Sequence, residues 1–404
     1  MTQDLPLAGV RVLELATVVA APTASRIMAA YGARVIKVEA PNGDLLRPLG
    51  TAHQLPAEDG NNPLFDLFNA GKELVSMDLK TTEGMTLFHR LLARSDVFIT
   101  NVRMRSLEKM GLGYETLKEA YPRLIYAHFS GLGLTGPDAD RPGFDTTAFW
   151  LRSGACRDWL TPGAFPMRPA FGFGDLATAN AFLSGILMAL LGRQATGHGT
   201  MLSTSLQHSG IWCSASAVVN SQYGKEYPTA RHEPWDPFSD YYECSDGEWL
   251  AIVEKEYTRD KAVLARLFDM PELLSDPRLS TLATMRQSGM RSGISRRMEA
   301  LMRTRPAHEW AALLDANDIP NERLRHYREI ADDPQANAND VFDRLTYPDG
   351  KTAALPTPPI RFSDFGRHET RPTGVIGADT DKVLRELGCS DEDIVILHEK
   401  KIVT

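Results

Sequence analysis

The chain has 404 residues, of which 43% are hydrophobic and 24% are charged, a composition that is ordinary for folded proteins and excludes wholesale disorder. Its 44 Lys and Arg residues are outnumbered by 52 Asp and Glu residues, and the formal net charge of −8 argues against a nucleic-acid-binding protein. No apolar stretch reaches about 18 residues, and the start lacks a basic segment followed by an apolar one, so we expect a cytoplasmic protein without a membrane span or secretory signal.

The first part of the chain alternates between short apolar segments and helix-like segments. We expect strands at 10–15, 34–38, 74–77, 96–99 and 124–127, and helices at 22–31, 81–93 and 114–120. This alternation is typical of βαβ units and predicts an α/β fold with a doubly wound parallel sheet, whose ligands bind at the carboxyl ends of the strands. The turn at 17–22 lacks the G-x-G-x-x-G pattern of nicotinamide dinucleotide enzymes, which weakens the case for a dehydrogenase.

The elements expected further along the chain are less regular. In order they are a helix rich in Ala, Leu and Met over 176–193, a strand over 200–205, a linker or mobile loop over 220–240, a hairpin over 241–253, helical segments to about 317, a Pro-rich connector over 355–359 and an amphipathic helix over 380–387. The long helix ends at Gly192 or at the TGHG segment of 196–199. The hairpin is expected to open a second, smaller domain.

The cysteines and histidines carry no metal or redox pattern. Cys156, Cys213, Cys244 and Cys389 are too widely spaced for a zinc or disulfide-exchange motif. We therefore expect free thiols in a reducing compartment and no metal site. His198 and His208 are expected to be structural.

An ordered series of short motifs runs through nearly the whole chain. They are LAGVRVLE at 7–14, GARVIKVE at 32–39, GD at 43–44, NAGK at 69–72, TNVR at 100–103, GLGLTGP at 131–137, PGFD at 142–145, GD at 174–175, TGHG at 196–199, DIP at 318–320 and LPTPPIRFS at 355–363. In this order they resemble the class III CoA-transferases, the CaiB/BaiF family that includes formyl-CoA transferase. Segments 142–145 and 234–238 are most similar to the 2-hydroxyacid CoA-transferases of amino-acid fermentation, which act on phenyllactate or isocaproate-type acids.

The resemblance implies an unusual architecture. It implies a Rossmann-like large domain built from both chain ends, 1–220 and 326–404, and a smaller inserted α+β domain over 221–325. Two such subunits are expected to interlock as rings in a homodimer. No tightly bound cofactor is implied, because CoA and acyl-CoA are substrates, together with a carboxylic acid.

Asp175 occupies the position of the family's catalytic carboxylate. The sequence alone also fits an Asp that caps the following helix, and the two roles are compatible because a helix N-terminus favours an ionised carboxylate. The resemblance implies that Asp175 attacks the donor thioester, forms a mixed anhydride and then an aspartyl-CoA thioester, and passes CoA to the acceptor acid. Other activities left open are a carnitine- or bile-acid-type transferase, an acyl-CoA racemase and a non-catalytic acyl-CoA-binding protein.

Two further groups of residues match family positions for substrates. The candidates for CoA contacts are Val19, Ala20, Arg47, Lys72, Asn101, Arg103 and Lys109; each cation also fits a solvated surface charge. The candidates for acceptor contacts are Asp145, Phe149, Trp235 and Phe238. Their aromatic rings would favour an apolar or aromatic acid, unless they pack in the core or at the dimer interface. Segment 232–238 lacks the glycine run that some relatives use to shield the anhydride.

Overall fold

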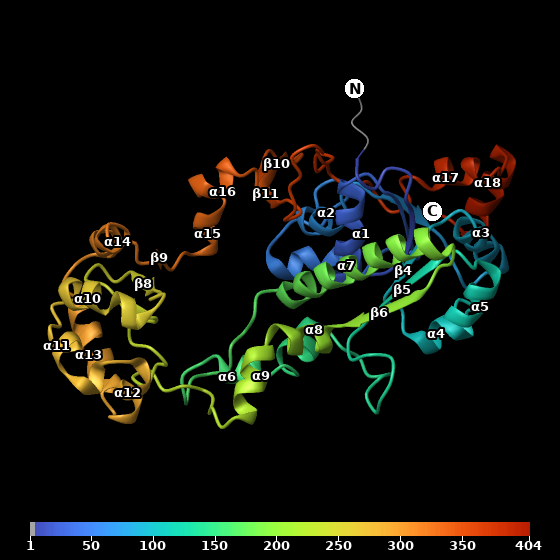
Figure 1. Ribbon diagram of the computed structural model, residues 1–404. Helices are drawn as coiled ribbons and strands as arrows, with labels where there is room; N and C mark the ends of the chain where they lie inside the picture. The colour runs from blue at the N-terminus through green and yellow to red at the C-terminus, as the bar shows by residue number, and fades with distance from the viewer. Residues whose placement is uncertain (1–4) are drawn as a thin grey trace. The chain divides into compact units, whose positions relative to one another are not determined.

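The computed structural model describes residues 5–404 and divides them into two compact units (Figure 1). The large unit comprises the chain up to Cys156, Arg168–Val219 and Pro334–Thr404, and the small unit comprises Arg157–Met167 and Asn220–Asp333. The sequence prediction placed the small domain at 221–325. In the structure a second passage of the chain, 157–167, also belongs to the small unit, and this unit ends at residue 333.

The large unit is built on a six-stranded sheet with the order β3-β2-β1-β4-β5-β6. Its strands are β1 (Arg11–Leu15), β2 (Arg34–Glu39), β3 (Glu73–Ser76), β4 (Val97–Thr100), β5 (Ile125–Ser130) and β6 (Met201–Ser205). All neighbouring strands pair in parallel, which confirms the predicted parallel sheet. The strand order reverses between β1 and β4, and such a switch point leaves a crevice for a ligand at the carboxyl ends of the strands.

Helices connect the strands and follow them. They are α1 (Ala20–Ala30), α2 (Pro63–Asn69), α3 (Thr82–Leu92), α4 (Met104–Lys109), α5 (Tyr114–Ala120), α6 (Ala155–Asp158), α7 (Phe173–Thr196), α8 (Leu206–Cys213), α9 (Ala215–Gln222), α16 (Pro334–Ala338), α17 (Thr380–Glu386) and α18 (Asp391–Glu399), with helical turns η1 (Arg47–His53) and η2 (Asp145–Trp150). A hairpin of β10 (Phe342–Thr346) and β11 (Thr352–Pro356) precedes the last two helices.

Both ends of the chain contribute to one core. Phe98 and Tyr126 of the sheet belong to the same buried cluster as Leu91 of α3, Leu384 of α17 and Ile394 of α18. The returning chain is therefore held to the N-terminal sheet by apolar burial, which contributes about 1.5–3 kcal/mol for each large side chain.

Helix α7 is longer than the sequence predicted. It begins after Gly172 and ends before Gly197, and both glycines have a left-handed backbone, which glycine adopts without strain. Asp175 lies inside the first turn, because the N-cap position belongs to Gly172, so the expectation of an Asp cap is corrected.

The same helix bears on the expected absence of a membrane span. Within residues 5–404, α7 is the one helix that is long and apolar enough to cross a membrane by length and composition, which the sequence analysis did not foresee. Core helices of soluble proteins pass the same test. Here Ala179, Phe182 and Ile186 of α7 are buried in the large unit.

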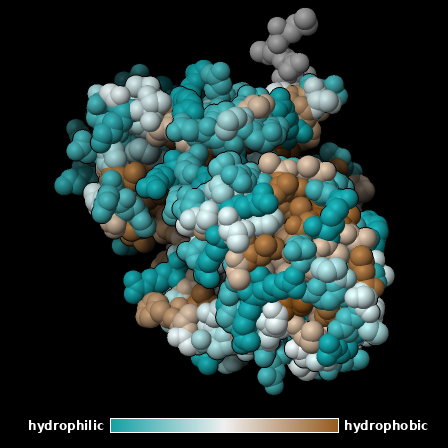
Figure 2. Space-filling model, turned by 90° about the vertical axis from the view of Figure 1, so that its left-hand side faces the viewer, coloured by the Kyte–Doolittle hydropathy of each residue, from teal (hydrophilic) through white to brown (hydrophobic). Residues whose placement is uncertain are grey.

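The small unit has its own sheet and core. Its elements are the antiparallel strands β7 (Tyr241–Glu243), β8 (Trp249–Ile252) and β9 (Asn321–Arg323), the helices α10 (Tyr257–Leu267), α11 (Glu272–Ser275), α12 (Leu282–Gln287), α13 (Arg291–Met302), α14 (Ala307–Asp315) and α15 (Tyr327–Ile330), and the turn η3 (Pro277–Leu279). The predicted hairpin at 241–253 is formed by β7 and β8. In Figure 2, hydrophobic residues gather in one area of the face shown, among hydrophilic ones.

Candidate active site

A pocket of the large unit lies at the switch point of the sheet. Its walls come from the loops after β1, β2 and β4, the end of β5 with the loop that follows, and the first turns of α7 and α8. The lining residues include Thr17, Val18, Val19, Ala20, Leu45, Asn101, Arg103, Met104, His128, Phe129, Leu134, Phe144, Asp175 and Leu206. The predicted nucleophile and four of the predicted CoA contacts therefore meet in one pocket.

Asp175 combines burial with a titration near neutral pH. Its side chain projects from the first turn of α7, and the residue is only 8% exposed. Burial, together with the negative charge of Asp145, raises the pKa of Asp175 to about 7. A carboxylate with this pKa is ionised in much of the population at neutral pH and is poorly solvated, which suits a nucleophile.

Asp145 lies against the turn that carries Asp175. Its Oδ1 would overlap with a Cβ atom on Gly174, and the nearby Gly172, Gly174 and Trp150 favour its ionised form. Burial nevertheless raises the pKa of Asp145. The negative charge of Asp145, at the start of η2, thus opposes ionisation of Asp175 in the first turn of α7.

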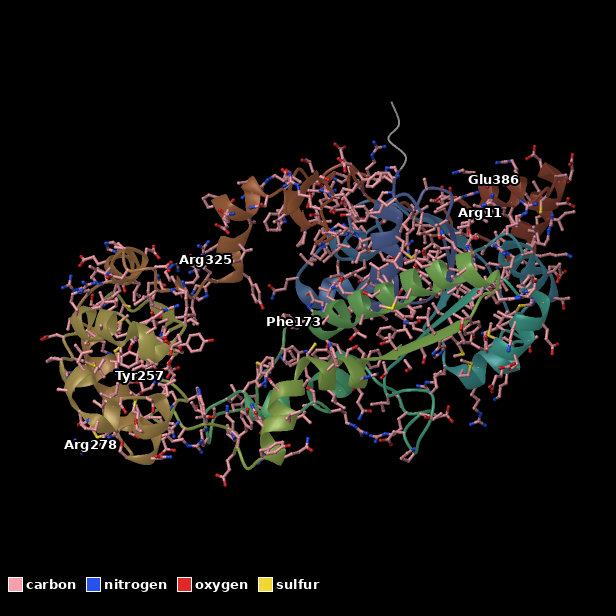
Figure 3. The ribbon with its side chains drawn as sticks, viewed as in Figure 1. Arg11, Phe173, Tyr257, Arg278, Arg325 and Glu386 are labelled. Carbon is pink, nitrogen blue, oxygen red and sulfur yellow. The ribbon has the colours of Figure 1, made fainter. Side chains whose placement is uncertain are left out.

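Gly174 is required by the close approach of its neighbours. A Cβ atom at this position would overlap with Oδ1 of Asp145 and with the ring of Phe149. Phe149 is buried and packs behind the turn. Figure 3 shows Phe173 at the N-terminal end of α7, where its ring packs 5.3 Å from the ring of Trp150.

The loop after β1 forms the opposite wall of the pocket. Asn101 fixes it with two hydrogen bonds: Thr17 N–H donates to Oδ1 over 3.1 Å, and Nδ2 donates to the Thr17 carbonyl over 2.8 Å. Helix α1 begins at Ala20, and Val19 is its N-cap residue. Because a valine side chain offers no acceptor, the N–H groups of this first turn are suited to an anionic ligand such as a phosphate.

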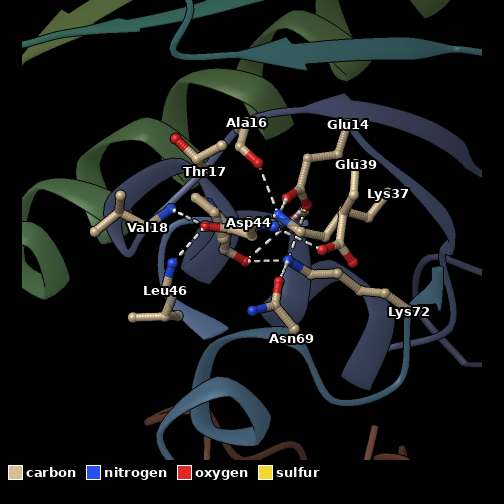
Figure 4. A network of polar contacts seen from close by, with 12 residues as sticks. Glu14, Ala16, Thr17, Val18, Lys37, Glu39, Asp44, Leu46, Asn69 and Lys72 are labelled. Atoms are coloured by element: carbon tan, nitrogen blue, oxygen red, sulfur yellow. Dashed lines mark hydrogen bonds and ion pairs between the residues drawn. The ribbon is translucent and has the colours of Figure 1, made fainter. Parts of the chain in front are cut away.

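The predicted cations have different surroundings. Arg103 is exposed and lines the pocket, whereas Lys109 lies in the last turn of α4, exposed and outside the pocket lining that the described residues form. Lys72 is buried, and its ammonium group contacts Oε2 of Glu14 at 2.8 Å, the Pro22 carbonyl at 2.9 Å and Oδ1 of Asn69 at 2.9 Å (Figure 4). These contacts commit its terminal nitrogen to the protein, so Lys72 is placed as a structural residue.

Arg47 is likewise committed to the protein. Its Nε and Nη2 donate to the two carboxylate oxygens of Glu39 at 2.8 Å each, and the guanidinium lies 4.1 Å from the centre of the Phe65 ring. The sequence could not separate such a bidentate pair from a phosphate contact, because both use the same residue type.

The two acceptor candidates of the small unit differ in exposure. Trp235 is 59% exposed, with Lys225 and Arg286 near its ring. Phe238 has no exposed surface and stacks between Tyr257 and Phe268 in the core of the small unit. The expectation of a substrate contact at Phe238 is therefore corrected to a core role.

Sequence reasoning missed His128 and Val18. His128 is 2% exposed at the carboxyl end of β5, and its Nε2 lies 2.9 Å from the Val102 carbonyl. Burial lowers the pKa of this imidazole, so it is neutral at pH 7. The sequence signal for His128 was its place at the carboxyl end of a predicted parallel strand, where ligands bind. Within residues 5–404 no group of three or more His, Cys, Asp or Glu side chains is placed to hold a metal ion.

Comparison with known proteins identifies the family of the chain. The model of the family described as CoA-transferase family III matches residues 7–380. The (R)-2-hydroxy-4-methylpentanoate CoA-transferase of Clostridioides difficile is 35% identical over 98% of this chain and 99% of its own length, and the cinnamoyl-CoA:phenyllactate CoA-transferase of Clostridium sporogenes is 33% identical over 97% and 96%. The crystal structure of a CAIB/BAIF family protein from Brucella suis matches with a TM-score of 0.77 and 27% identity, covering 95% of this chain and 100% of that one. The chain therefore belongs to CoA-transferase family III and is a class III CoA-transferase.

Proposed function

We propose that this enzyme transfers CoA from an acyl-CoA donor to a 2-hydroxyacid, with Asp175 as the nucleophile. The observation that carries the proposal is a buried carboxylate, with its pKa raised to about 7, in the first turn of α7 and in the pocket at the switch point of the sheet. The named substrates of the two bacterial relatives, a hydroxylated branched acid and phenyllactate, supply the acceptor class.

The proposed steps conserve the thioester bond. An oxygen of Asp175 attacks the thioester carbonyl of the donor, the C–S bond breaks, and a mixed anhydride and CoA thiolate result. The thiolate attacks the aspartyl carbonyl, which releases the donor acid and leaves an aspartyl-CoA thioester. The acceptor carboxylate attacks the carbonyl of this thioester, the C–S bond breaks, and a second mixed anhydride and CoA thiolate form. The thiolate then attacks the acceptor carbonyl of the anhydride, so that the new acyl-CoA forms and the Asp175 carboxylate leaves. Burial of the nucleophile limits hydrolysis of the anhydride.

The nucleophile is tested by trapping. Incubation with acyl-CoA and then hydroxylamine is expected to convert Asp175 to a hydroxamate, detected by peptide mass spectrometry. Asp66, another buried aspartate, is bound by Thr373 and Tyr347 and is expected to stay unmodified. Asp175→Ala should lower kcat at least about a thousandfold. Full transfer activity in this variant would rule out the proposed nucleophile.

The acceptor class is tested by a series of acids. Val18, Leu45, Met104, Phe129 and Leu134 give the pocket an apolar lining, and each methylene that a substrate buries contributes about 0.8 kcal/mol. We expect kcat/KM to rise from formate through lactate to branched and aryl 2-hydroxyacids. A preference for formate would exclude the proposed acceptor class. Trp235 is proposed as an additional acceptor contact because its ring is exposed.

We further propose that two subunits form the interlocked homodimer that the family resemblance implies. Helices α7, α8 and α9 expose large apolar side chains, among them Met188, Leu191, Trp212 and Val219. Exposed apolar surface of this kind is typical of an interface between proteins.

A further inference from the structure

The loop after β1 contains an unfavourable backbone conformation. Val18 has a φ of 68°, in the left-handed region. A β-branched residue is rare there, because its side chain crowds the backbone, and such conformations persist only where the surroundings impose them. Glycine would adopt this conformation freely, so a valine here requires an anchor.

Asp44 provides that anchor. The Val18 N–H donates to Oδ1 of Asp44 over 3.0 Å, and the same oxygen accepts the Leu46 N–H over 2.9 Å. The other carboxylate oxygen pairs with Nζ of Lys37 at 2.8 Å, and Asp44 is only 2% exposed. Its backbone N–H donates to Oε2 of Glu39 over 2.9 Å. Asp44 is therefore fixed on several sides.

The anchor is part of a buried network of charges beneath the loop (Figure 4). Nζ of Lys37 also contacts Oε1 of Glu14 at 2.8 Å and the Ala16 carbonyl at 2.7 Å. Glu14 and Lys37 have no exposed side-chain surface. Burial alone would lower the pKa of Lys37, but Glu14 and Asp44 outweigh it and raise the pKa, so the ammonium group stays charged. Lys37 thus holds Asp44 through a buried ion pair.

The anchored loop contacts the residues that carry the chemistry. Val18 and Val19 line the pocket together with Asp175. A Cβ atom on Gly172, the N-cap of α7, would lie 3.5 Å from Cγ1 of Val19. A change in the φ of Val18 would therefore move a wall of the pocket next to the turn of Asp175.

We propose that Asp44 is a positioning residue, which holds Val18 in its left-handed conformation and so shapes the acyl-CoA-binding wall of the pocket. This inference rests on the proposed function, because it assumes that acyl-CoA occupies this pocket. It assigns to the buried pair of Asp44 and Lys37 a role in substrate binding as well as in the fold.

The test compares substitutions on both sides of the hydrogen bond. Asp44→Ala removes the acceptor, and Val18→Pro removes the donor and fixes φ near −65° while leaving the buried charges intact. Both variants are expected to raise KM for acyl-CoA about ten- to a hundredfold, the effect of losing a charge-assisted hydrogen bond, with a smaller change in kcat. Val18→Gly in the Asp44→Ala background is expected to restore part of this loss, because glycine needs no anchor.

Asp66→Ala is the matched control. Asp66 is a buried aspartate of the same unit that accepts hydrogen bonds from Tyr347 and Thr373, away from the pocket lining. It is expected to lower Tm without raising KM for acyl-CoA. The inference would be overturned if KM for acyl-CoA were unchanged in Val18→Pro, or if it rose equally in Asp66→Ala. If Asp44→Ala does not fold, the KM of Val18→Pro decides. If calorimetry shows that the wild type binds CoA and hydroxylamine traps Asp175, the proposed function stands and only the role of Asp44 is rejected.

Discussion

At the scale of single residues, the proposed role of Asp175 predicts how the enzyme responds to pH. The proposed mechanism requires ionised Asp175, whose pKa is raised to about 7 by burial and by Asp145. We expect kcat/KM to rise with pH up to about 7 and then level off. Asp145→Asn keeps the shape of the side chain but removes the negative charge that raises the pKa of Asp175, so the acid limb should move to lower pH. If the wild type and Asp145→Asn lost activity over the same acidic pH range, the effect of Asp145 on the pKa of Asp175 would be contradicted.

The same pKa shift predicts an effect on stability. Because the pKa of Asp175 is raised from 3.8 to about 7, the folded state binds the proton of this carboxyl group more tightly than the unfolded chain does. The stability that the protonated group gives the folded state is therefore lost as pH rises from about 4 to 7. Asp175→Asn is uncharged at every pH, so it removes the free-energy cost of ionising a buried carboxyl group. It should raise the free energy of unfolding at pH 8, by at most about 4 kcal/mol at about 1.4 kcal/mol for each pKa unit, and by little at pH 4. Denaturant unfolding at the two pH values checks this, and an equal effect at both would refute it.

At the scale of secondary-structure elements, the sequence predicted the parallel sheet well and the site in part. Strand and helix positions follow from apolar spacing, which burial in the sheet imposes. Lys72 and Arg47 were misplaced because a cation that neutralises a buried carboxylate has the same sequence signature as one that binds phosphate. The left-handed Val18 could not be predicted, because the anchoring Asp44 is distant in the sequence.

Helix α7 offers a matched pair of glycine substitutions. Gly174→Ala would bring a methyl group into Asp145 and Phe149, so we expect the turn to shift and kcat to fall by at least about tenfold, since small displacements in an active site are costly. Gly192→Ala in the same helix meets nothing within 4 Å. It should stabilise the protein by about 0.5–1 kcal/mol and leave kcat unchanged. Similar behaviour of the two variants, in kinetics and in thermal unfolding, would argue against a special role for the turn.

At the scale of the whole molecule, the return of the chain end to the N-terminal sheet places 334–404 in the large unit. The Pro-rich connector and the amphipathic segment at 380–387 were usable signals, because an amphipathic helix needs an apolar surface to cover. Whether a particular aromatic residue faces a substrate or a core is not encoded in its local pattern. Phe238 and Trp235 lie three residues apart, yet Phe238 is fully buried and Trp235 is largely exposed.

The proposed homodimer leads to a prediction about mass and dilution. If two ring-like subunits interlock, they can separate only when one ring opens by partial unfolding. The protein should therefore keep twice the chain mass of 44.7 kDa even at nanomolar concentration. Trp212 of α8 is 76% exposed, and Trp212→Asp would place a carboxylate where an apolar partner surface is expected. Sedimentation of this variant should show monomers or a loss of soluble protein. Val395→Asp on α18, which changes a 56% exposed valine outside these helices, should stay dimeric. A monomeric wild type would overturn the proposed homodimer, and a Trp212→Asp variant that assembles normally would show that α8 lies outside the subunit interface.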